Sequence, residues 1–317
     1  MSKISTLGLA GAGVIGAGWA ARALYHDLKV VVYDPSPDSQ KKLIQAVKTA
    51  WPSLTELNGD KTFPADNLSF TTELKQMVQA ADWIQESAPE REDLKISLFV
   101  KIDALADPEI IIASSSSGFL PSNLQSKCQH PERVIIAHPF NPVYLLPLVE
   151  IVAGKKTSFD SVERAAKFYT SIGMHALKLP NEIDGYVCDR LQEALWREAL
   201  HIVNKGAGTT ADIDDAIIYS AGLRWAFMGP FMTYHLAGGE GGMAHFLSQF
   251  DPELELPWTD LGFPKWSDEL EQKLIAGCEE QAAGKTYQQW EAKRNAVLVD
   301  IIKVLEKHGI GAGSLKT

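Results

Sequence analysis

The 317-residue chain is 45% hydrophobic and 22% charged, which is typical of a globular protein with one large or two medium domains. Its 30 basic and 40 acidic residues give a net charge of −10, which argues against a nucleic-acid partner because phosphate neutralisation requires clustered Lys and Arg. The three cysteines form no close pair, and no apolar run approaches the roughly 18 residues that span a bilayer, so a disulfide framework, a metal site and a membrane segment are all unexpected.

The first predicted elements form a dinucleotide-binding unit. The N-terminus passes from Met1-Ser2-Lys3 straight into an apolar strand, 4–10, without the layout of a signal peptide, and we expect a cytoplasmic protein. A glycine-rich turn and a helical pattern follow, and a second apolar run, 30–33, ends in an acidic residue, Asp34.

Each part of this pattern has a physical role in holding a dinucleotide. The glycines allow a tight turn and close approach of a pyrophosphate, which the N–H groups of the helix N-terminus bind. Asp34, 18 residues after Gly16, would accept from the ribose hydroxyls and repel a 2′-phosphate, which predicts NAD rather than NADP. The alternative is a glycine-rich turn without a ligand. The residues expected to hold NAD are Gly11, Gly13, Val14, Ile15, Gly16 and Asp34.

The segment 38–80 reads as a helical insertion, with a helix from Gln40 to Trp51 that we expect Pro52 to end and a short strand candidate at 68–70. Strands at 83–85 and 110–113 then flank a helix at 94–105. This alternation predicts a Rossmann-type, doubly wound parallel sheet, in which ligands bind beyond the carboxyl ends of the strands. Among the residues near those ends, we expect Glu90 and Lys95 to contact the cofactor, and Ser114, Ser115, Ser116 and Ser117 form a serine run. Such a run is either a polar loop or the source of a hydroxyl that binds a substrate oxygen.

His138 emerges from an apolar run, 134–137, and Glu150 lies in a second one, 148–152. An unpaired buried carboxylate is costly, and the imidazole is its obvious partner. A histidine oriented by a carboxylate acts as a general base. The alternative is a structurally satisfied core histidine and a glutamate on an edge strand.

Strand signals stop after residue 180, and five helices are predicted to follow, at 185–204, 209–220, 231–249, 268–283 and 286–308. The fold class is therefore α/β, with a Rossmann-type domain over 1–182 and an all-α domain over 183–317. The helical domain is expected to contribute to substrate binding and to dimerisation.

The glycine motif, the serine run, the His138–Pro142 segment, Glu150 and the segment Asp184–Leu191 together resemble the 3-hydroxyacyl-CoA dehydrogenase superfamily over nearly the whole chain. The resemblance implies catalytic roles for Ser117, His138 and Glu150, with Asn141 as a further contact to the substrate oxygen. Asp189 stands where the family usually has Asn. That carboxylate could help to hold a cationic substrate, or could brace Ser117 or a helix.

The helical half is most similar to the carnitine 3-dehydrogenase branch, through segments 193–200, 222–229, 237–243 and 276–281. This resemblance implies NAD-dependent oxidation of the 3-hydroxyl of L-carnitine by a homodimer, with His138 as the base. Arg224 and its neighbour Trp225 are the candidate substrate contacts, and the alternative for Arg224 is a solvated surface charge. An Arg fork suits a carboxylate, and a trimethylammonium requires aromatic faces or acids. The alternatives are L-gulonate 3-dehydrogenase or another short 3-hydroxy acid dehydrogenase, and a non-catalytic, crystallin-like NAD-binding protein. The aromatic candidates for the cation are Trp196, Trp225, Phe227, Phe231, Tyr234, Phe246 and Phe250.

Overall fold

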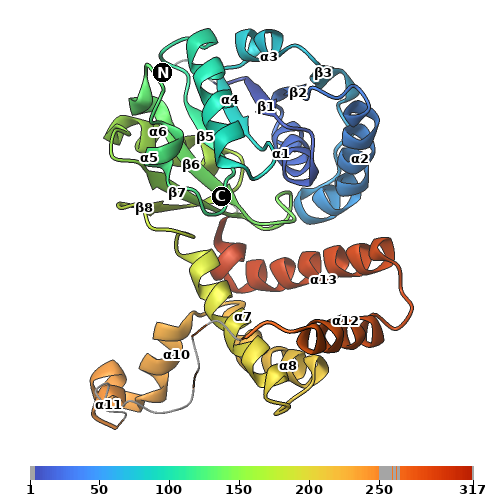
Figure 1. Cartoon of the computed structure of the whole chain (residues 1–317), viewed down its shortest axis with the longest axis vertical. Helices are drawn as coiled ribbons and strands as arrows, with labels where there is room; N and C mark the ends of the chain where they lie inside the picture. The colour runs from blue at the N-terminus through green and yellow to red at the C-terminus, as the bar shows by residue number, and fades with distance from the viewer. Residues whose placement is uncertain (1–3, 250–258, 260–261, 263–264, 316–317) are drawn as a thin grey trace. The chain divides into compact units, whose positions relative to one another are not determined.

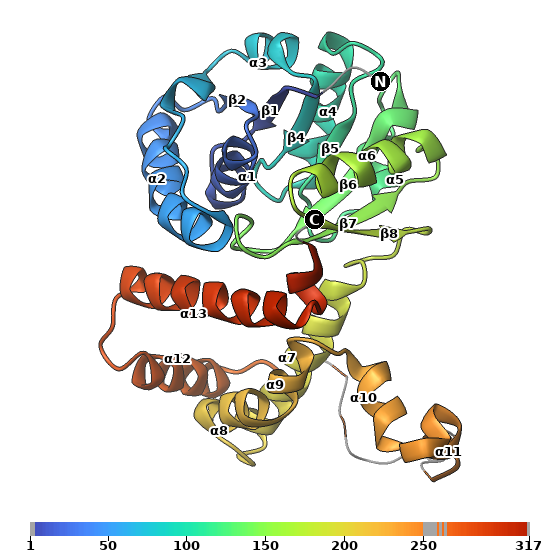
Figure 2. The same ribbon diagram turned by 180° about the vertical axis from the view of Figure 1, so that it is seen from behind.

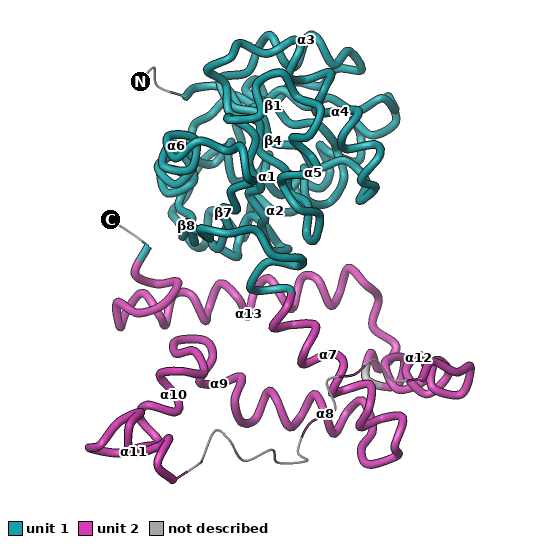
Figure 3. Tube along the Cα trace, turned by 60° about the vertical axis from the view of Figure 1, so that its left-hand side comes forward, with its two compact units in different colours: residues 1–189, 315–317 teal, residues 190–314 magenta. Residues whose placement is uncertain are grey.

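The structure is a computed structural model that describes residues 4–249, 259, 262 and 265–315. It divides into two compact units, one of residues 1–189 with 315–317 and one of residues 190–314 (Figure 3). The sequence places the domain boundary after residue 182, whereas the units divide inside the first turn of helix α7. In the part of the chain that is described, no helix combines the length and the apolarity needed to cross a membrane.

Unit 1 is built on one eight-stranded sheet with the order β3-β2-β1-β4-β5-β6-β7-β8. All neighbouring strands are parallel except β6 and β7, which are antiparallel. The predicted α/β fold class is confirmed. The strands are β1 (Thr6–Ala10), β2 (Lys29–Tyr33), β3 (Leu68–Thr71), β4 (Trp83–Glu86), β5 (Ile112–Ser114), β6 (Val134–Pro139), β7 (Leu148–Ala153) and β8 (His175–Leu179).

Helices cover both faces of this sheet. Successive side chains of a strand point to opposite faces, so the apolar strands present side chains to be buried on both. Ile84 of β4 packs with residues of α3 and α4, whereas its neighbour Trp83 stacks on Phe168 of α6 at 4.4 Å. Figure 1 shows α4 in front of the sheet, and Figure 2 shows α6 in front from the other side. The helices of unit 1 are α1 (Val14–Tyr25), α2 (Ser39–Asn58), α3 (Leu74–Ala80), α4 (Glu92–Leu105), α5 (Pro121–Leu124) and α6 (Phe159–Ser171), with 3₁₀ turns at Ala65–Asn67 and Pro131–Arg133.

Helix α2 corrects one sequence expectation, because it continues through Pro52 to Asn58. Proline removes one backbone hydrogen bond from a helix interior. Here the buried face of α2 continues on both sides of the ring, through Trp51, Leu54 and Leu57. The burial of these apolar side chains outweighs the lost hydrogen bond.

The antiparallel pair β6–β7 positions the chemistry of unit 1. Residues 140–147 join the two strands, and a link this short reverses the chain rather than crossing over the sheet, since a parallel crossover needs about a dozen residues or more. His138 and Glu150 consequently lie directly opposite each other in the ladder. Directly opposed residues have neighbouring side chains on one face.

Unit 2 is helical, as expected. The predicted helix at 209–220 is continuous with a π-helical turn and α9, while the predicted helix at 231–249 is divided at Gly238–Gly242, where Gly239 and Gly242 have φ of 59°. Residues 250–258, 260–261 and 263–264, between the predicted helices at 231–249 and 268–283, lie outside the described residues. The elements are α7 (Cys188–Asn204, shared with unit 1), α8 (Thr210–Ala216), η3 (Ile217–Ala221), α9 (Gly222–Trp225), α10 (Pro230–Ala237), η4 (Gly239–Gly241), α11 (Gly242–Gln249), α12 (Asp268–Ala282), α13 (Tyr287–His308) and η5 (Gly311–Leu315).

Candidate active site

His138 and Glu150 form the centre of the candidate site. The Nδ1 atom of His138 lies 2.9 Å from Oε2 of Glu150, and both side chains are buried. An ionised carboxylate accepts and does not donate, so Nδ1 carries the proton of the neutral ring. The other nitrogen, Nε2, is then left with a lone pair, which is the tautomer that a general base needs.

The second oxygen of Glu150 is also bound. Oε1 accepts from the backbone N–H groups of Val187 and Cys188, at 3.1 and 3.0 Å, and so ties β7 to the start of α7. Burial acts to raise the pKa of Glu150, but the hydrogen bonds from His138, Cys188 and Val187 outweigh it and hold this pKa below its ordinary value of 4.5. At neutral pH Glu150 is therefore an anion that orients the ring.

Asp189, in the first turn of α7, approaches the other side of the same ring. Its Oδ2 lies 3.8 Å from Nε2 of His138, which is beyond hydrogen-bond length but within ion-pair range. Burial raises the pKa of Asp189; the charge on His138 opposes this rise, and Glu150 and Glu90 add to it. His138 thus lies between two carboxylates, one bound to Nδ1 and one facing Nε2.

A buried polar network, which the sequence patterns did not predict, joins the carboxyl ends of β4 and β5. Lys95 Nζ lies 2.7 Å from Glu86 Oε1, and the Ser114 hydroxyl donates to Glu86 Oε2 at 2.5 Å. All three side chains are buried, and the exposed fractions of Lys95 and Glu86 are 1% and 0%. In the sequence, Glu86 stands at the end of an apolar strand. A carboxylate in such a run indicates a buried partner, as it does for Glu150.

Through Lys95 this network reaches the predicted catalytic serine. Lys95 Nζ also lies 3.2 Å from Oε2 of Glu90, whose Oε1 accepts from the Ser116 hydroxyl and from the Ser117 N–H, the latter at 3.1 Å. Ser117 itself has an exposed side chain, as does Asn141, two residues after the end of β6. The network therefore determines where the Ser117 backbone lies at the edge of the sheet.

Lys95, which the sequence predicts to contact the cofactor, is bound to acceptors within the protein. The three N–H donors of its ammonium group have acceptors in Glu86, Glu90 and the carbonyl oxygen of Ala88, which lies 3.2 Å away. Lys95 acts on this edge chiefly by holding Glu90, whose side chain is 46% exposed. Glu90 is therefore the member of the pair that is available to a ligand.

The glycine-rich loop fits a dinucleotide. Gly11 has φ of 119°, and a Cβ added there would lie 2.4 Å from the Ser87 carbonyl oxygen, so only glycine is accommodated. A Cβ added to Gly13 would meet nothing within 4 Å, which leaves open space beside the loop. Helix α1 begins at Val14 without a side-chain cap, so its first N–H groups and its dipole are available to phosphate.

Asp34 connects the end of β2 to this loop. Its Oδ2 accepts from the Ala12 N–H at 3.1 Å, and its Oδ1 accepts from the Ser36 N–H and the Ser39 hydroxyl at 3.0 and 3.1 Å. The carboxylate is therefore held beside the glycine-rich turn by backbone and side-chain donors. This is the position from which an acid can reach a ribose.

The substrate contacts expected from the helical half belong to unit 2. Arg224 and Trp225 lie on α9 with exposed side chains. Tyr234 and Phe246 stack with their ring centroids 4.8 Å apart. The remaining expected aromatic residues, Trp196, Phe227 and Phe231, are exposed, and Phe250 lies outside the described residues.

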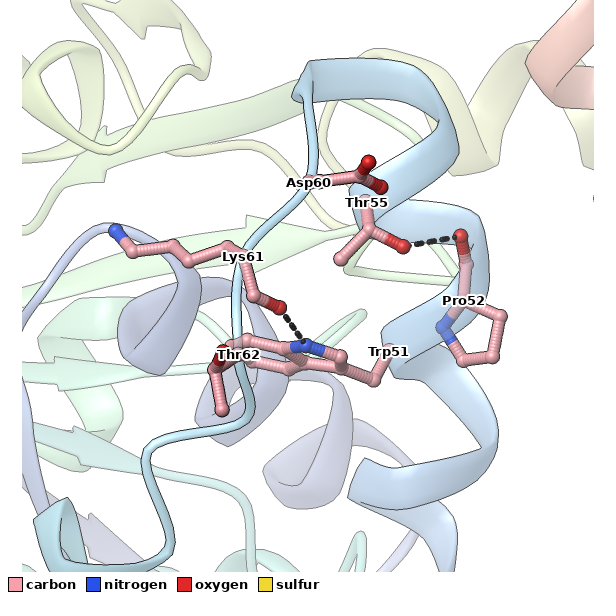
Figure 4. Close-up of a pocket in the computed structure, with 6 residues that line it drawn as sticks. All are labelled: Trp51, Pro52, Thr55, Asp60, Lys61 and Thr62. Carbon is pink, nitrogen blue, oxygen red and sulfur yellow. Dashed lines mark hydrogen bonds between the residues drawn. The ribbon is translucent and has the colours of Figure 1, made fainter.

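A separate pocket of about 470 Å³ lies at the end of α2, and it contains none of the predicted site residues. Figure 4 shows the Trp51 indole N–H donating to the Lys61 carbonyl oxygen, 2.7 Å away, while the Lys61 ammonium group points away from Asp60. That ammonium pairs with Asp27 at 2.7 Å. These contacts fasten the chain that follows α2, and we assign no chemistry to the pocket. It is lined by Trp51, Pro52, Thr55, Asp60, Lys61 and Thr62.

Comparison with known proteins matches both halves of the chain to one family. Residues 6–183 match the 3-hydroxyacyl-CoA dehydrogenase NAD-binding domain, and residues 185–274 match the C-terminal domain of the same family. The structure is also similar to that of 5-formyl-3-hydroxy-2-methylpyridine 4-carboxylic acid 5-dehydrogenase, an NAD⁺-dependent dismutase. The TM-score is 0.81 at 26% identity, over 96% of this chain and 99% of the other.

Two curated relatives are similar over their full lengths. L-carnitine dehydrogenase of Pseudomonas putida is 48% identical over 314 residues, which cover 98% of each chain. L-carnitine dehydrogenase of Oceanobacillus iheyensis is 48% identical over 308 residues, which cover 97% of this chain and 99% of the other. The predicted family and cofactor are confirmed: the chain belongs to the 3-hydroxyacyl-CoA dehydrogenase family and is an NAD-dependent dehydrogenase.

Proposed function

We propose that this enzyme oxidises the 3-hydroxyl of L-carnitine to give 3-dehydrocarnitine, with His138 as the general base. The observation that carries the proposal is the buried His138–Glu150 pair, which leaves Nε2 to accept a proton. The substrate is supported by the two relatives named L-carnitine dehydrogenase, each 48% identical over nearly the whole chain.

In this mechanism Nε2 of His138 takes the hydroxyl proton as the C3–H bond breaks. NAD, when bound, supplies the acceptor for the hydride. Glu150 holds the ring through Nδ1 and stabilises the imidazolium that forms. The chain therefore contributes a proton acceptor of fixed orientation and a buried negative charge.

The remaining site residues orient the two ligands. Ser117 and Asn141 hydrogen-bond the substrate oxygen and hold the carbinol carbon in place. Arg224 binds the carnitine carboxylate bidentately, and Trp225 covers an adjacent part of the substrate. The cofactor is held by the glycine-rich loop and its partners, Gly11, Gly13, Val14, Ile15, Gly16, Asp34, Glu90 and Lys95.

The proposal also covers the oligomeric state of the enzyme and its cellular compartment. Unit 2 exposes many large apolar side chains in the single chain, which supports a homodimer formed through this unit. The cysteines at 128, 188 and 278 are free thiols, which suits the reducing cytoplasm. The exposed apolar residues include Leu195, Trp196, Ile218, Tyr219, Leu223, Phe231 and Leu236.

Substitution of Asp34 by Ala is expected to weaken NAD binding by about 10- to 100-fold and to relax the preference for NAD over NADP, because a charge-assisted hydrogen bond to the ribose is lost. Isothermal titration of both dinucleotides measures this directly. Asp38→Ala is the matched control, since Asp38 is an exposed acid four residues away whose side chain caps no helix. Unchanged affinity for both dinucleotides in Asp34→Ala would contradict the assignment.

The function itself is tested by incubating the purified protein with NAD and L-carnitine at mildly alkaline pH. One NADH should form for each 3-dehydrocarnitine, followed by absorbance and by mass spectrometry of the product. A correctly folded protein that binds NAD and forms no NADH with L-carnitine would contradict the proposal.

A further inference from the structure

Asp189 lies beside the proton-accepting atom of His138. Because Nδ1 of His138 is bound to Glu150 at 2.9 Å, a substrate hydroxyl has to approach Nε2. Asp189 Oδ2 lies 3.8 Å from that nitrogen, and 34% of the Asp189 side-chain surface is exposed. The carboxylate therefore borders the space that the reacting alcohol and its neighbouring atoms have to enter.

The distances place one part of a substrate beside Asp189. A hydroxyl oxygen bound to Nε2 lies about 2.8 Å from it, as in other hydrogen bonds. A nitrogen on the carbon next to the alcohol lies about 3 Å from that oxygen when the torsion between them is gauche. These lengths are comparable with the 3.8 Å between Nε2 and Asp189 Oδ2. A cation on the adjacent carbon can therefore reach ion-pair range of Asp189 when it turns toward the Oδ2 side of the ring.

The surrounding charges favour a cation at this point. Burial raises the pKa of Asp189, His138 opposes this rise, and the like charges of Glu150 and Glu90 add to it. Among the described ion pairs, Glu90 is paired with Lys95, and Lys95 is also paired with Glu86. A positively charged ligand would relieve the repulsion between these carboxylates, whereas an anionic one would increase it.

We propose that Asp189 determines specificity by binding a quaternary ammonium group on the carbon next to the reacting alcohol. The proposal rests on the proposed function, since it assigns one group of L-carnitine to one residue. A quaternary ammonium has no N–H to donate, so a carboxylate recognises it by charge alone. A neutral Asn at this position would provide no such attraction.

The test compares two substrates that differ only in that charge. In 3-hydroxy-5,5-dimethylhexanoate of the same configuration, a carbon replaces the ammonium nitrogen of carnitine and the shape is kept. Asp189→Asn is expected to reduce the ratio of kcat/KM for L-carnitine to kcat/KM for this isostere by about 10- to 100-fold, the effect of removing one close ion pair in a partly buried site. The neutral isostere should lose far less.

Two control variants separate charge at the site from other effects. Asp189→Glu keeps the charge and should retain a higher ratio than Asp189→Asn. Asp160→Asn, at an exposed position of α6, removes the same charge from the surface and should leave the ratio unchanged. Thermal unfolding of each variant establishes that it is folded.

The outcomes distinguish this inference from the proposed function. Equal losses with both substrates in Asp189→Asn would overturn the inference and make Asp189 a positioning residue for His138. The absence of any loss with either substrate would overturn it as well. If the unsubstituted enzyme did not oxidise L-carnitine at all, the proposed function would fail and the inference would fall with it.

Discussion

Replacement of His138 by Ala is expected to lower kcat for alcohol oxidation by about 10²- to 10⁴-fold, the usual contribution of a positioned general base. The substitution removes Nε2, the proton acceptor, and leaves Oε2 of Glu150 without its partner. The affinity for NAD should change little, because the glycine-rich loop and Asp34 belong to other elements. Steady-state kinetics of NADH formation, together with an NAD titration, measure both quantities.

His130→Ala is the matched control for this substitution. His130 is also followed by a proline, but its side chain is 40% exposed and pairs with the exposed Glu132 at 3.4 Å. Its removal should leave kcat within a factor of about two, as for most surface substitutions. Undiminished turnover by a folded His138→Ala variant would show that His138 is not the base.

Replacement of Lys95 by Met should reduce the free energy of unfolding by about 3–5 kcal/mol, because it leaves Glu86 buried without its counter-charge. Lys95 and Glu86 are 1% and 0% exposed, and their charged atoms lie 2.7 Å apart. Burial already raises the pKa of Glu86, against the opposing effect of Lys95. Urea unfolding of the enzyme without NAD measures the loss.

A second ion pair in the same unit provides the control. Lys178 Nζ and Glu163 Oε1 are also 2.7 Å apart, but their side chains are 47% and 31% exposed. Lys178→Met should therefore cost less than about 1 kcal/mol. If the two lysine substitutions destabilised the protein equally, burial would not be what makes the Lys95–Glu86 pair important.

Local patterns in the sequence predicted those parts of the site that depend on neighbouring residues. The glycine spacing predicted the loop before α1, where Gly11 has φ of 119°. The rule that a buried carboxylate needs a partner predicted that His138 would bind Glu150, and the structure has this hydrogen bond. The same rule, applied to Glu86, would have indicated a buried partner such as Lys95.

Other features depend on contacts between distant parts of the chain. The position of Asp189 follows from two hydrogen bonds that anchor the start of α7 to Glu150, and no local pattern encodes them. Helix α2 passes Pro52 because its apolar face packs on both sides, so tertiary packing overrides a local signal. The roles of Arg224 and Trp225 stay predictions, since they rest on the resemblance and on the chemistry of a carboxylate and a cation.

The most direct test of the central claim is a comparison of NADH formation from L-carnitine, L-gulonate and 3-hydroxybutyryl-CoA by the same purified enzyme at mildly alkaline pH. The account predicts that L-carnitine has the highest kcat/KM by a wide margin. Preferred turnover of L-gulonate or of the CoA ester would contradict the proposed substrate and the role of Asp189, while leaving His138 and Glu150 as the base and its partner.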